Sequence, residues 1–554
     1  MEKSKAIIVV ENPEALRVAA ASARISTQQG TAMDIFSRSL GDEKDHRLID
    51  KVLSSGHKSV IEHQTFGIAF NDVSVLVEQF VIECRLASFT VKSRRYVDFG
   101  EAGWVCPTGL DEAQRVLFNR QMAARFEDYR RLMELGVPKE DARFVLPYAL
   151  RSNFFMTVNA RELIGLTCAM LYGRGKGFAE IEALGAQLKA QFDKLYPGVI
   201  DKEAARMSSM ERNAFADFGG NPTACEGGAE IVNAPKDAMA LIDAGLKFTG
   251  RFSRENLRDL LLDARPRELE LLRYTFRVEH ISLACLTHFT RHRMVSLLVP
   301  PVYNALAGGA YVLPESVKAV PEALKIYEAA FLDQHRAAQE ALDIGMRRED
   351  LSYFAMSGHE LDVLLSMNAR ELAHFMRLRT CSRAQWEIRG VAMKMLEALK
   401  AQTPEIYDMF GPSCRFGPCP EGRMSCGKPW KGFRNRRWSR RSYETRGTAQ
   451  GDARRRTVEG HPAPLLDLRR TPRGRGRAQL AHDADGLFRV GRISRSGHGE
   501  GLQNVPDPRP GRMLYRRHPR VPQKGFGCGQ GGRTAVPLGG RPARALPHRN
   551  ARAV

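Results

Sequence analysis

The apolar residues of segment 368–400 recur at the spacing of two consecutive helices. The first helix would carry its apolar and basic side chains on different faces: Leu372, Phe375 and Met376 on one, and Arg370, His374 and Arg377 on the other. Ser382 followed by Gln385 has capping-box spacing and predicts the start of the second helix, whose apolar positions continue to Leu399. Arg379 then lies near the junction of the two helices, where a side chain can project into a cleft.

The same order of patterns occurs twice along the chain. A short apolar strand pattern, "TFGIAF" at 65–70 and "YTFRV" at 274–278, is followed each time by a helical stretch, an irregular segment and several long helices. We therefore expect an α/β fold in which a small sheet packs against long helices.

Direct sequence repeats support a duplication. Three segments return after about 209 residues: "TVNARELIGL" (157–166) as "SMNARELAHF" (366–375), "GVPKEDAR" (136–143) as "GMRREDLS" (345–352), and "ECRLAS" from Glu83 as "RHRMVS" from Arg291. Three matches in one register indicate two tandem copies of one unit.

The repeats and the composition divide the chain into three parts. We place repeat 1 at 1–216 and repeat 2 at 226–429, joined by the Gly- and Pro-containing "DFGGNPTACEGG". Residues 430–554 form a tail rich in Arg, Gly and Pro without a sustained hydrophobic period, which is typical of an unstructured segment.

The tail carries essentially all of the net charge of +21, because it holds about 29 basic and about 8 acidic residues. Residues 1–429 are therefore close to neutral, and the basic pI does not indicate a nucleic-acid partner for the folded part. The tail could be an RNA-binding segment or the out-of-frame reading of a GC-rich gene. We favour the second interpretation, because the arginines lack RGG periodicity and order among aromatic residues, and we do not expect nucleic acid as a partner.

Targeting and cysteine patterns indicate a cytoplasmic protein without a membrane segment. The opening apolar run is too short for a signal peptide, and the ten cysteines are scattered in the manner of reduced thiols. Cys414, Cys419 and Cys426 could hold zinc, but their spacing matches no CxxC pair. His57 and His63 are six residues apart and would not share a helix face, so no metal is predicted.

The segments "ECRLASFTVKSRRY" and "RHRMVSLLVPPVYN" resemble two diverged versions of the RHRxxSxNExSxRY signature of flavin-dependent thymidylate synthases. The resemblance extends to "SGHKSVIEHQTFGIAF", "DARFVLP", "NAREL" and "LRTCSRAQWEI", and so covers most of both repeats. It implies a compact α/β domain that binds FAD, uses NADPH as reductant and methylenetetrahydrofolate as carbon donor, and converts dUMP to dTMP. It also implies a homotetramer with active sites shared between subunits.

The two copies have lost complementary parts of this signature. Repeat 1 keeps Ser93, Arg95 and Tyr96 but has Glu83 and Cys84 in place of Arg and His. Repeat 2 keeps Arg291, His292, Arg293 and Ser296 but has Pro301 and Tyr303 in place of the phosphate-binding Ser and Arg. Arg143 of repeat 1 has Ser352 as its counterpart, whereas Arg379 is kept only in repeat 2.

The resemblance assigns roles to these residues. Arg379 is the catalytic residue, a cation beside the uracil ring that stabilises negative charge spreading onto the carbonyl oxygens. The substrate-binding residues are Ser93, Arg95, Arg143, His288 and Arg291, and guanidinium groups suit a phosphate dianion. The FAD-binding residues are His57, Ser59, Arg291, His292, Arg293, Asn368, Arg370 and His374.

The division of retained residues predicts a pseudo-dimer with one complete site built across the two repeats, while the reciprocal site has decayed. Two such chains, a homodimer, would imitate the family tetramer. Thr90-Val91 and Leu298-Val299 replace the Asn-Glu pair of the signature, and His288 replaces its Gln. Two alternatives therefore stay open: a diverged flavin-dependent methyltransferase acting on another nucleotide, and a non-catalytic flavin- or nucleotide-binding relative.

Overall fold

The computed structural model describes residues 4–206, 212–250, 260–261 and 266–428. Both repeats lie within a single compact unit. The interpretations of the tail at 430–554 fall outside the described residues.

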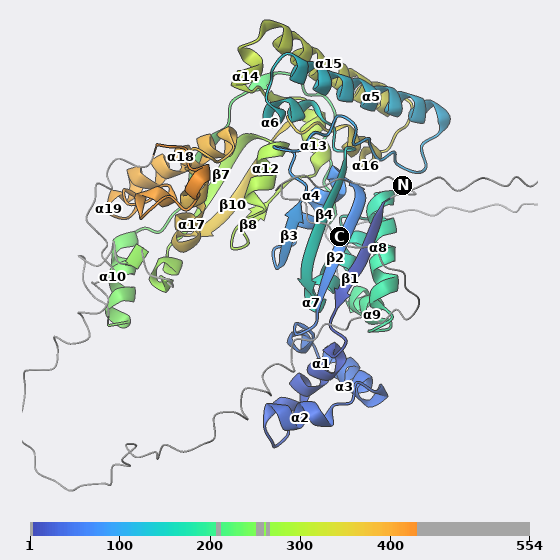
Figure 1. Ribbon diagram of the computed structural model, residues 1–554, viewed down its shortest axis with the longest axis vertical. Coiled ribbons are helices and arrows are strands. Elements are labelled where there is room, and N and C mark those ends of the chain that lie inside the picture. Colours follow the sequence, from blue (N-terminus) through green and yellow to red (C-terminus); the bar gives the residue numbers. More distant parts are fainter. Residues whose placement is uncertain (1–3, 207–211, 251–259, 262–265, 429–554) are drawn as a thin grey trace, which may run out of the picture. The chain divides into compact units, whose positions relative to one another are not determined.

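The first repeat is built on a four-stranded sheet in the order β1-β2-β4-β3, with all neighbours antiparallel (Figure 1). The strands are β1 (Lys5–Glu11), β2 (Thr65–Ser74), β3 (Ala87–Val91) and β4 (Arg151–Asn159). The pattern "TFGIAF" indeed lies in β2. Alternate residues of β4, namely Phe154, Met156 and Val158, are buried, as expected for a sheet with one face in the core.

Helices cover that sheet and form a small cap at its end. They are α1 (Ala15–Ile25), α2 (Ala32–Arg38), α3 (Glu43–Ser54), η1 (Lys58–Ile61), α4 (Val75–Ile82), α5 (Glu112–Glu134), α6 (Lys139–Ala142), η2 (Arg143–Val145), α7 (Ala160–Leu171), α8 (Ala179–Phe192) and α9 (Val199–Arg206). Gln187 and Gln191 of α8 accept hydrogen bonds from the backbone N–H groups of Ala6 and Ile8, at 3.0 and 2.9 Å. Helix α8 thereby binds the edge strand β1.

The second repeat has a sheet of the same design, in the order β6-β7-β10-β8 and again antiparallel. Its strands are β6 (Gly228–Asn233), β7 (Arg273–Ser282), β8 (Ser296–Leu298) and β10 (Glu360–Asn368). The segment before it contributes β5 (Ala224–Cys225), which pairs in parallel with β9 (Tyr311–Val312). The pattern "YTFRV" lies in β7, and the predicted duplication of an α/β unit is confirmed.

The helices of the second repeat follow the order of those of the first, except that α13 and α14 have no helical counterpart between β3 and α5. They are α10 (Ala238–Phe248), η4 (Arg267–Leu271), α12 (Leu283–Phe289), α13 (Val302–Gly308), α14 (Glu315–Lys318), α15 (Pro321–Asp343), α16 (Arg348–Leu351), η5 (Ser352–Phe354), α17 (Ala369–Arg379), α18 (Trp386–Gln402), α19 (Pro404–Tyr407), η6 (Ser413–Arg415) and η7 (Gly422–Met424). Helices α5 and α15 of the two repeats pack side by side (Figure 1).

The two predicted helices of segment 368–400 are present as α17 and α18, and Arg379 is the last residue of α17. The capping-box prediction was wrong. The N-cap of α18 is Gln385, whose side-chain oxygen accepts a hydrogen bond from the Ile388 N–H at 3.0 Å. Gln385 therefore satisfies the free N–H groups itself, and the helix starts one turn later than Ser382 would place it.

A β-bulge occurs at the same position in both sheets. The register of β2 with β4 shifts between Phe70 and Val73, and that of β7 with β10 shifts between Leu361 and Val363. Asp72 and His280 are the residues at the bulge, and both have φ of 52°. Asn153 accepts a hydrogen bond from the Asp72 N–H, and Asp362 accepts one from the His280 N–H. Such a detailed match supports a common origin of the two repeats.

The repeats are joined by two extended segments, 144–149 and 353–358, which we call the clasp. Tyr148 N donates to Ala355 O at 2.7 Å, and the equivalent bond in the other direction joins Ser357 N to Leu146 O at 3.0 Å. Ala149 N donates to Tyr353 O, and Gly358 N donates to Phe144 O. Each contact is matched by its reciprocal, as in an isologous dimer interface.

Gly358 allows the clasp to close. A Cβ atom added there would lie 2.8 Å from Phe331 Cζ and 2.8 Å from Tyr327 Oη, both on buried side chains of α15. We predict that Gly358→Ala lowers the free energy of unfolding by about 1–3 kcal/mol, because packed rings must move. Chemical denaturation of the purified protein measures the change.

The matched control is Gly390→Ala in α18, where an added Cβ meets no atom within 4 Å. Because alanine favours a helix over glycine, this change should raise the free energy of unfolding by about 0.5–1 kcal/mol. Equal effects of the two substitutions would contradict the packing argument.

Candidate functional site

Four arginines from the two repeats gather around the imidazole of His288, in the last turn of α12. Burial lowers the pKa of His288 well below its usual value, and the cations of Arg379, Arg143, Arg95 and Arg291 lower it further, in that order. Arg95 and Arg143 belong to repeat 1, whereas Arg291 and Arg379 belong to repeat 2. The structure thus brings together five of the residues that the sequence singled out, and His288 is neutral at neutral pH.

Two buried polar atoms of this cluster have neither a hydrogen bond nor an ion pair among the described residues. They are Nη2 of Arg143 and Nε2 of His288, and both are buried. Burial lowers the pKa of Arg143 and of Arg379 to about 10, so both guanidinium groups stay charged at neutral pH. Buried cations with unused donors are costly unless an anion satisfies them, so the cluster is suited to a bound anion.

Arg379 is held by a chain of hydrogen bonds that starts at Glu371. Glu371 Oε1 lies 3.0 Å from His292 Nδ1, and Arg379 Nε donates to His292 Nε2 at 3.0 Å. The imidazole must therefore carry its proton on Nδ1 and donate it to Glu371. Arg379 Nη2 also donates to the backbone oxygen of His288 at 3.3 Å. These bonds fix the direction of the Arg379 side chain.

Arg95 is positioned by both repeats. Its Nε lies 2.8 Å from Glu140 Oε1 of α6, and its Nη2 donates to the backbone oxygen of Arg383 at 3.5 Å. Ser93 Oγ accepts a hydrogen bond from the Arg95 N–H at 3.3 Å. The Ser93 hydroxyl therefore lies in the same loop as Arg95.

Arg291 and Arg293 contact strand β3 of repeat 1. Arg291 Nη1 donates to Phe89 O at 3.3 Å, and Arg293 Nη2 donates to Ser88 Oγ at 2.7 Å. The start of the signature-like segment of repeat 2 therefore contacts the equivalent segment of repeat 1.

Three of the predicted FAD-binding residues line one cavity of about 400 Å³. These are Asn368, Arg370 and His374, at the start of α17. Asn368 also caps this helix by accepting the Glu371 N–H at 2.9 Å, and Arg370 forms an ion pair with Glu270. An amide, a guanidinium and an imidazole on one wall are donors that fit the phosphates and polar ring atoms of a dinucleotide.

His57 and Ser59 are not brought to this cavity. They lie at the start of η1 in repeat 1 and are exposed. Within the described part of the chain, neither has a hydrogen bond to Arg291, His292 or Arg293.

The reciprocal position carries different charges. Glu83, which stands in place of an arginine, forms a 2.5 Å ion pair with Arg174, whose guanidinium also lies over the Phe80 ring at 5.0 Å. These residues line two cavities: one of about 50 Å³ together with Pro301 and Ser352, and one of about 550 Å³ together with Cys84 and His292. At this position a carboxylate is paired with the Arg174 guanidinium, and Ser352 stands in place of Arg143.

Sequence reasoning missed the carboxylates that hold the site. Glu371 stands inside "NAREL" and Glu140 inside "GVPKEDAR", so both were in the repeated motifs, but their partners are distant in sequence. Cys414, Cys419 and Cys426 do not come close enough together to hold a metal in the described residues; the one group with that geometry is elsewhere.

Comparisons with known proteins agree with this geometry. The profile of the Thy1 family, described as thymidylate synthase complementing protein, matches residues 8–198 and 203–405. A flavin-dependent thymidylate synthase of Geobacter sulfurreducens is 39% identical over 163 residues, 29% of this chain and 70% of that protein. One of Clostridium tetani is 33% identical over 177 residues, 29% of this chain and 71% of that protein.

Two solved structures were also matched to parts of this chain. A thymidylate synthase X of Helicobacter pylori with FAD and dUMP is 21% identical, covers 36% of this chain and 99% of its own, and has a TM-score of 0.30. A UMP/dUMP methylase of Streptomyces cacaoi bound with 5-Br dUMP is 25% identical, covers 36% and 95%, and has a TM-score of 0.29. TM-scores of this size are too low to support a conclusion about this chain.

The protein is thus an enzyme of the thymidylate synthase class. The chain belongs to the Thy1 family of flavin-dependent thymidylate synthases and contains two tandem copies of the family domain. Among the described residues, no helix is both long enough and apolar enough to cross a bilayer.

Glu387 is a buried carboxyl beside this site and provides a pH test of it. Burial raises the pKa of Glu387 to about 7, although the hydrogen bonds from Ser282 and the Arg143 cation oppose the shift. A carboxyl whose pKa is raised on folding stabilises the folded state most at low pH, and this contribution declines between about pH 4.5 and 7. We predict that Glu387→Gln, which can keep both bonds to Ser282, reduces the fall of unfolding free energy over this range.

Urea denaturation at several pH values measures this dependence. An unchanged pH profile in Glu387→Gln would contradict a neutral, buried carboxyl at this position.

Proposed function

We propose that this protein is an FAD-dependent thymidylate synthase that converts dUMP to dTMP, with methylenetetrahydrofolate as carbon donor and NADPH as reductant. The observation that carries the proposal is the cluster of four arginines from both repeats around a neutral His288, with unused donors on Arg143 and His288. Relatives named flavin-dependent thymidylate synthases support the choice of activity and cofactor.

The phosphate of dUMP would be bound by the residues of repeat 1. Arg143 has a free Nη2, and Arg95 and Ser93 lie in one loop whose position is fixed by Glu140. A dianion offsets the mutual repulsion of the guanidinium groups, and paired N–H donors match its oxygens.

Arg379 of repeat 2 would lie beside the uracil ring. Its bonds to His292 and to the His288 carbonyl hold two of its nitrogens and leave the cation fixed in direction. A preorganised cation stabilises negative charge on the uracil carbonyl oxygens when the ring becomes nucleophilic at C5. No enzyme nucleophile is needed, and Ser93 would serve as a phosphate ligand.

FAD would be held by two groups of the predicted residues, one on helix α17 and one in the Arg-His-Arg segment. When bound, FAD supplies hydride chemistry. The wall formed by Asn368, Arg370 and His374 offers donors to its phosphates and polar ring atoms. Arg291, His292 and Arg293 lie between this wall and repeat 1. His57 and Ser59 lie elsewhere in the chain, and they would contact flavin bound by a second copy.

We further propose one composite site per chain, with a homodimer that imitates the family tetramer. Glu83 pairs with Arg174, and Ser352 and Tyr303 stand in place of Arg143 and Arg95, so little positive charge is left there for a nucleotide phosphate. The second site of the pseudo-dimer would therefore not bind the nucleotide.

A second candidate is a flavin-dependent methyltransferase, or a binding protein, for another nucleotide. It is favoured by Thr90-Val91 and Leu298-Val299, which replace the Asn-Glu pair of the signature, and by His288, which replaces its Gln. The same arginine cluster would bind its phosphate, so the two candidates differ in the base of the nucleotide that the protein binds.

Binding of dUMP tests the composite site. We expect about one dUMP per chain in equilibrium dialysis of the FAD-loaded protein. Arg143→Ser, which introduces the residue present in repeat 2, should weaken binding at least tenfold, because a buried charge-assisted bond to phosphate is worth about 1.5–3 kcal/mol. The matched control, Ser352→Ala in the reciprocal site, should leave binding unchanged. Two dUMP per chain, or equal effects of the two variants, would contradict one composite site.

Catalysis is tested by tritium release from [5-³H]dUMP with methylenetetrahydrofolate and NADPH. Arg379→Ala should reduce release by about 100-fold or more while bound FAD remains visible in the absorption spectrum. Bound flavin without release in the unmodified protein, together with tighter binding of another nucleotide, would favour the second candidate.

A further inference from the structure

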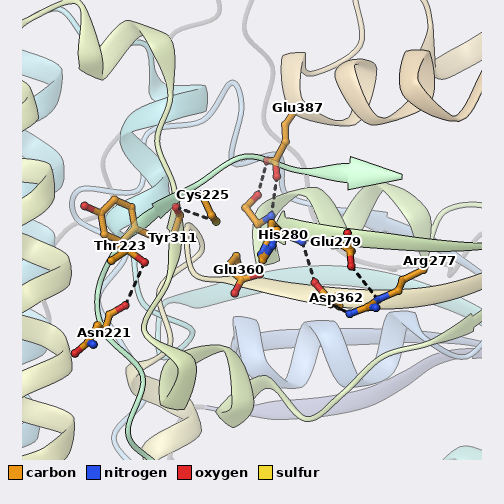
Figure 2. A network of polar contacts seen from close by, with 11 residues as sticks. Asn221, Thr223, Cys225, Arg277, Glu279, His280, Tyr311, Glu360, Asp362 and Glu387 are labelled. Carbon is orange, nitrogen blue, oxygen red and sulfur yellow. Dashed lines mark hydrogen bonds and ion pairs between the residues drawn. The ribbon is translucent and has the colours of Figure 1, made fainter. Parts of the chain in front are cut away.

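A second cluster of potential ligands lies where three strand segments of repeat 2 meet, outside the arginine cluster. Cys225 ends β5, His280 lies at the bulge of β7, and Glu360 starts β10. One ligand atom from each residue lies within 4.8 Å of the others, and His280 Nδ1 is 3.0 Å from Glu360 Oε2. Figure 2 shows the three side chains at this junction.

These residue types match one class of ligand. Thiolate sulfur, imidazole nitrogen and carboxylate oxygen are the three protein donors that bind zinc, and three protein ligands plus water form an open tetrahedral site. His280 is about half exposed, with 48% of its side chain accessible, so a fourth position can face solvent. We propose that Cys225, His280 and Glu360 bind one divalent metal ion of the zinc class.

The backbone holds all three ligands before any ion arrives. His280 has a left-handed φ of 52°, and its N–H donates to Asp362 Oδ1 at 3.0 Å. Glu360 N donates to Ala310 O at 3.0 Å, and Cys225 pairs with Val312 across β5 and β9. A site whose ligands sit on paired strands loses little conformational entropy when the ion binds.

The charge around the cluster also favours a cation. Glu360 and Asp362 lie near the Cys225 thiol, and Glu387, which accepts hydrogen bonds from Ser282, is also close to it (Figure 2). The nearby cations are already paired: Arg277 with Asp362 and Glu279, and Lys394 with Glu226 in the linker. Among the described residues, no arginine or lysine forms an ion pair with Glu360, and a carboxylate beside a thiol is unfavourable alone and is relieved by a divalent ion.

The same bulge in repeat 1 carries no such ligand set. Asp72 stands in place of His280, and Arg151 stands in place of Glu360 and donates to the Asp72 carbonyl at 2.8 Å. The ligands thus distinguish repeat 2 from repeat 1 on an otherwise shared backbone. Because Cys225 belongs to the linker between the repeats, the bound ion would tie that linker to the second sheet.

Cobalt titration tests the site in the full-length protein. The reduced protein is dialysed against a chelator, freed of the chelator, and titrated with Co²⁺ alone. We expect about one Co²⁺ per chain with a thiolate-to-cobalt charge-transfer band, which Zn²⁺ then displaces. Loss of a first ligand should weaken binding by more than about tenfold, since loss of an outer partner already costs 10–100-fold. The variants are Cys225→Ser, Glu360→Gln and His280→Asn, the last because asparagine tolerates a left-handed φ.

Two controls keep the test specific. Cys106→Ser removes another half-buried thiol that donates to a backbone carbonyl, that of Pro107, and should leave the band intact. Far-UV circular dichroism shows whether each variant is folded. If Cys225→Ser does not fold, the cobalt affinities of His280→Asn and Glu360→Gln test the site. A band that persists in Cys225→Ser, that is lost in Cys426→Ser instead, or that never forms in the unmodified protein would overturn the proposal.

Discussion

The pairing of the clasp segments 144–149 and 353–358 is the contact on which the rest of this molecule depends. Each backbone bond from repeat 1 to repeat 2 has its reciprocal, so the two domains meet around a pseudo-twofold axis near Pro147 and Met356. Arg143 directly precedes one clasp segment, and α12, which carries His288, is bound to the other through the bond of Ala284 N to Ser357 O. The contact that joins the repeats therefore also positions both halves of the arginine cluster.

An isologous contact between identical partners creates two equal sites, but fusion in one chain lets them diverge. One site keeps its guanidinium groups and leaves donors of Arg143 and His288 unsatisfied, at a cost in stability that a bound anion offsets. The other has replaced Arg143 and Arg95 by Ser352 and Tyr303, and its Glu83 neutralises Arg174. The loss of charge on one side removes the desolvation cost there, so divergence of one site stabilises the fold that the other needs.

The fold could be predicted from the sequence because the repeated motifs show the length of the repeated unit and the order of its strands and helices. The strands at Thr65 and Arg273, the helix that ends at Arg379 and the shared design of the two units follow from local patterns. The start of α18 could not be predicted, because Ser382 and Gln385 are both able to cap a helix and the local sequence does not decide between them. The supporting carboxylates Glu371 and Glu140 also escaped, since acidic residues on helices are usually solvated.

The Cys225, His280 and Glu360 cluster escaped for a related reason. Its members are spread over more than one hundred residues and share no ligand spacing, and only the bulge and the β5-β9 pairing bring them together. The cysteines that are close in sequence, near Cys419, do not form such a group in the described residues. Sequence spacing detects sites built within one element, whereas sites between strands depend on the fold.

The most direct test of the central claim asks whether the halves of the site belong to one chain. An Arg143→Ser chain and an Arg379→Ala chain would be co-expressed with different affinity tags, and mixed dimers purified through both tags. If each site is built from repeats 1 and 2 of the same chain, every site in the mixed dimer lacks one arginine and tritium release from [5-³H]dUMP stays at the level of the single variants. Restored release would contradict the account, because it requires a site assembled between two chains.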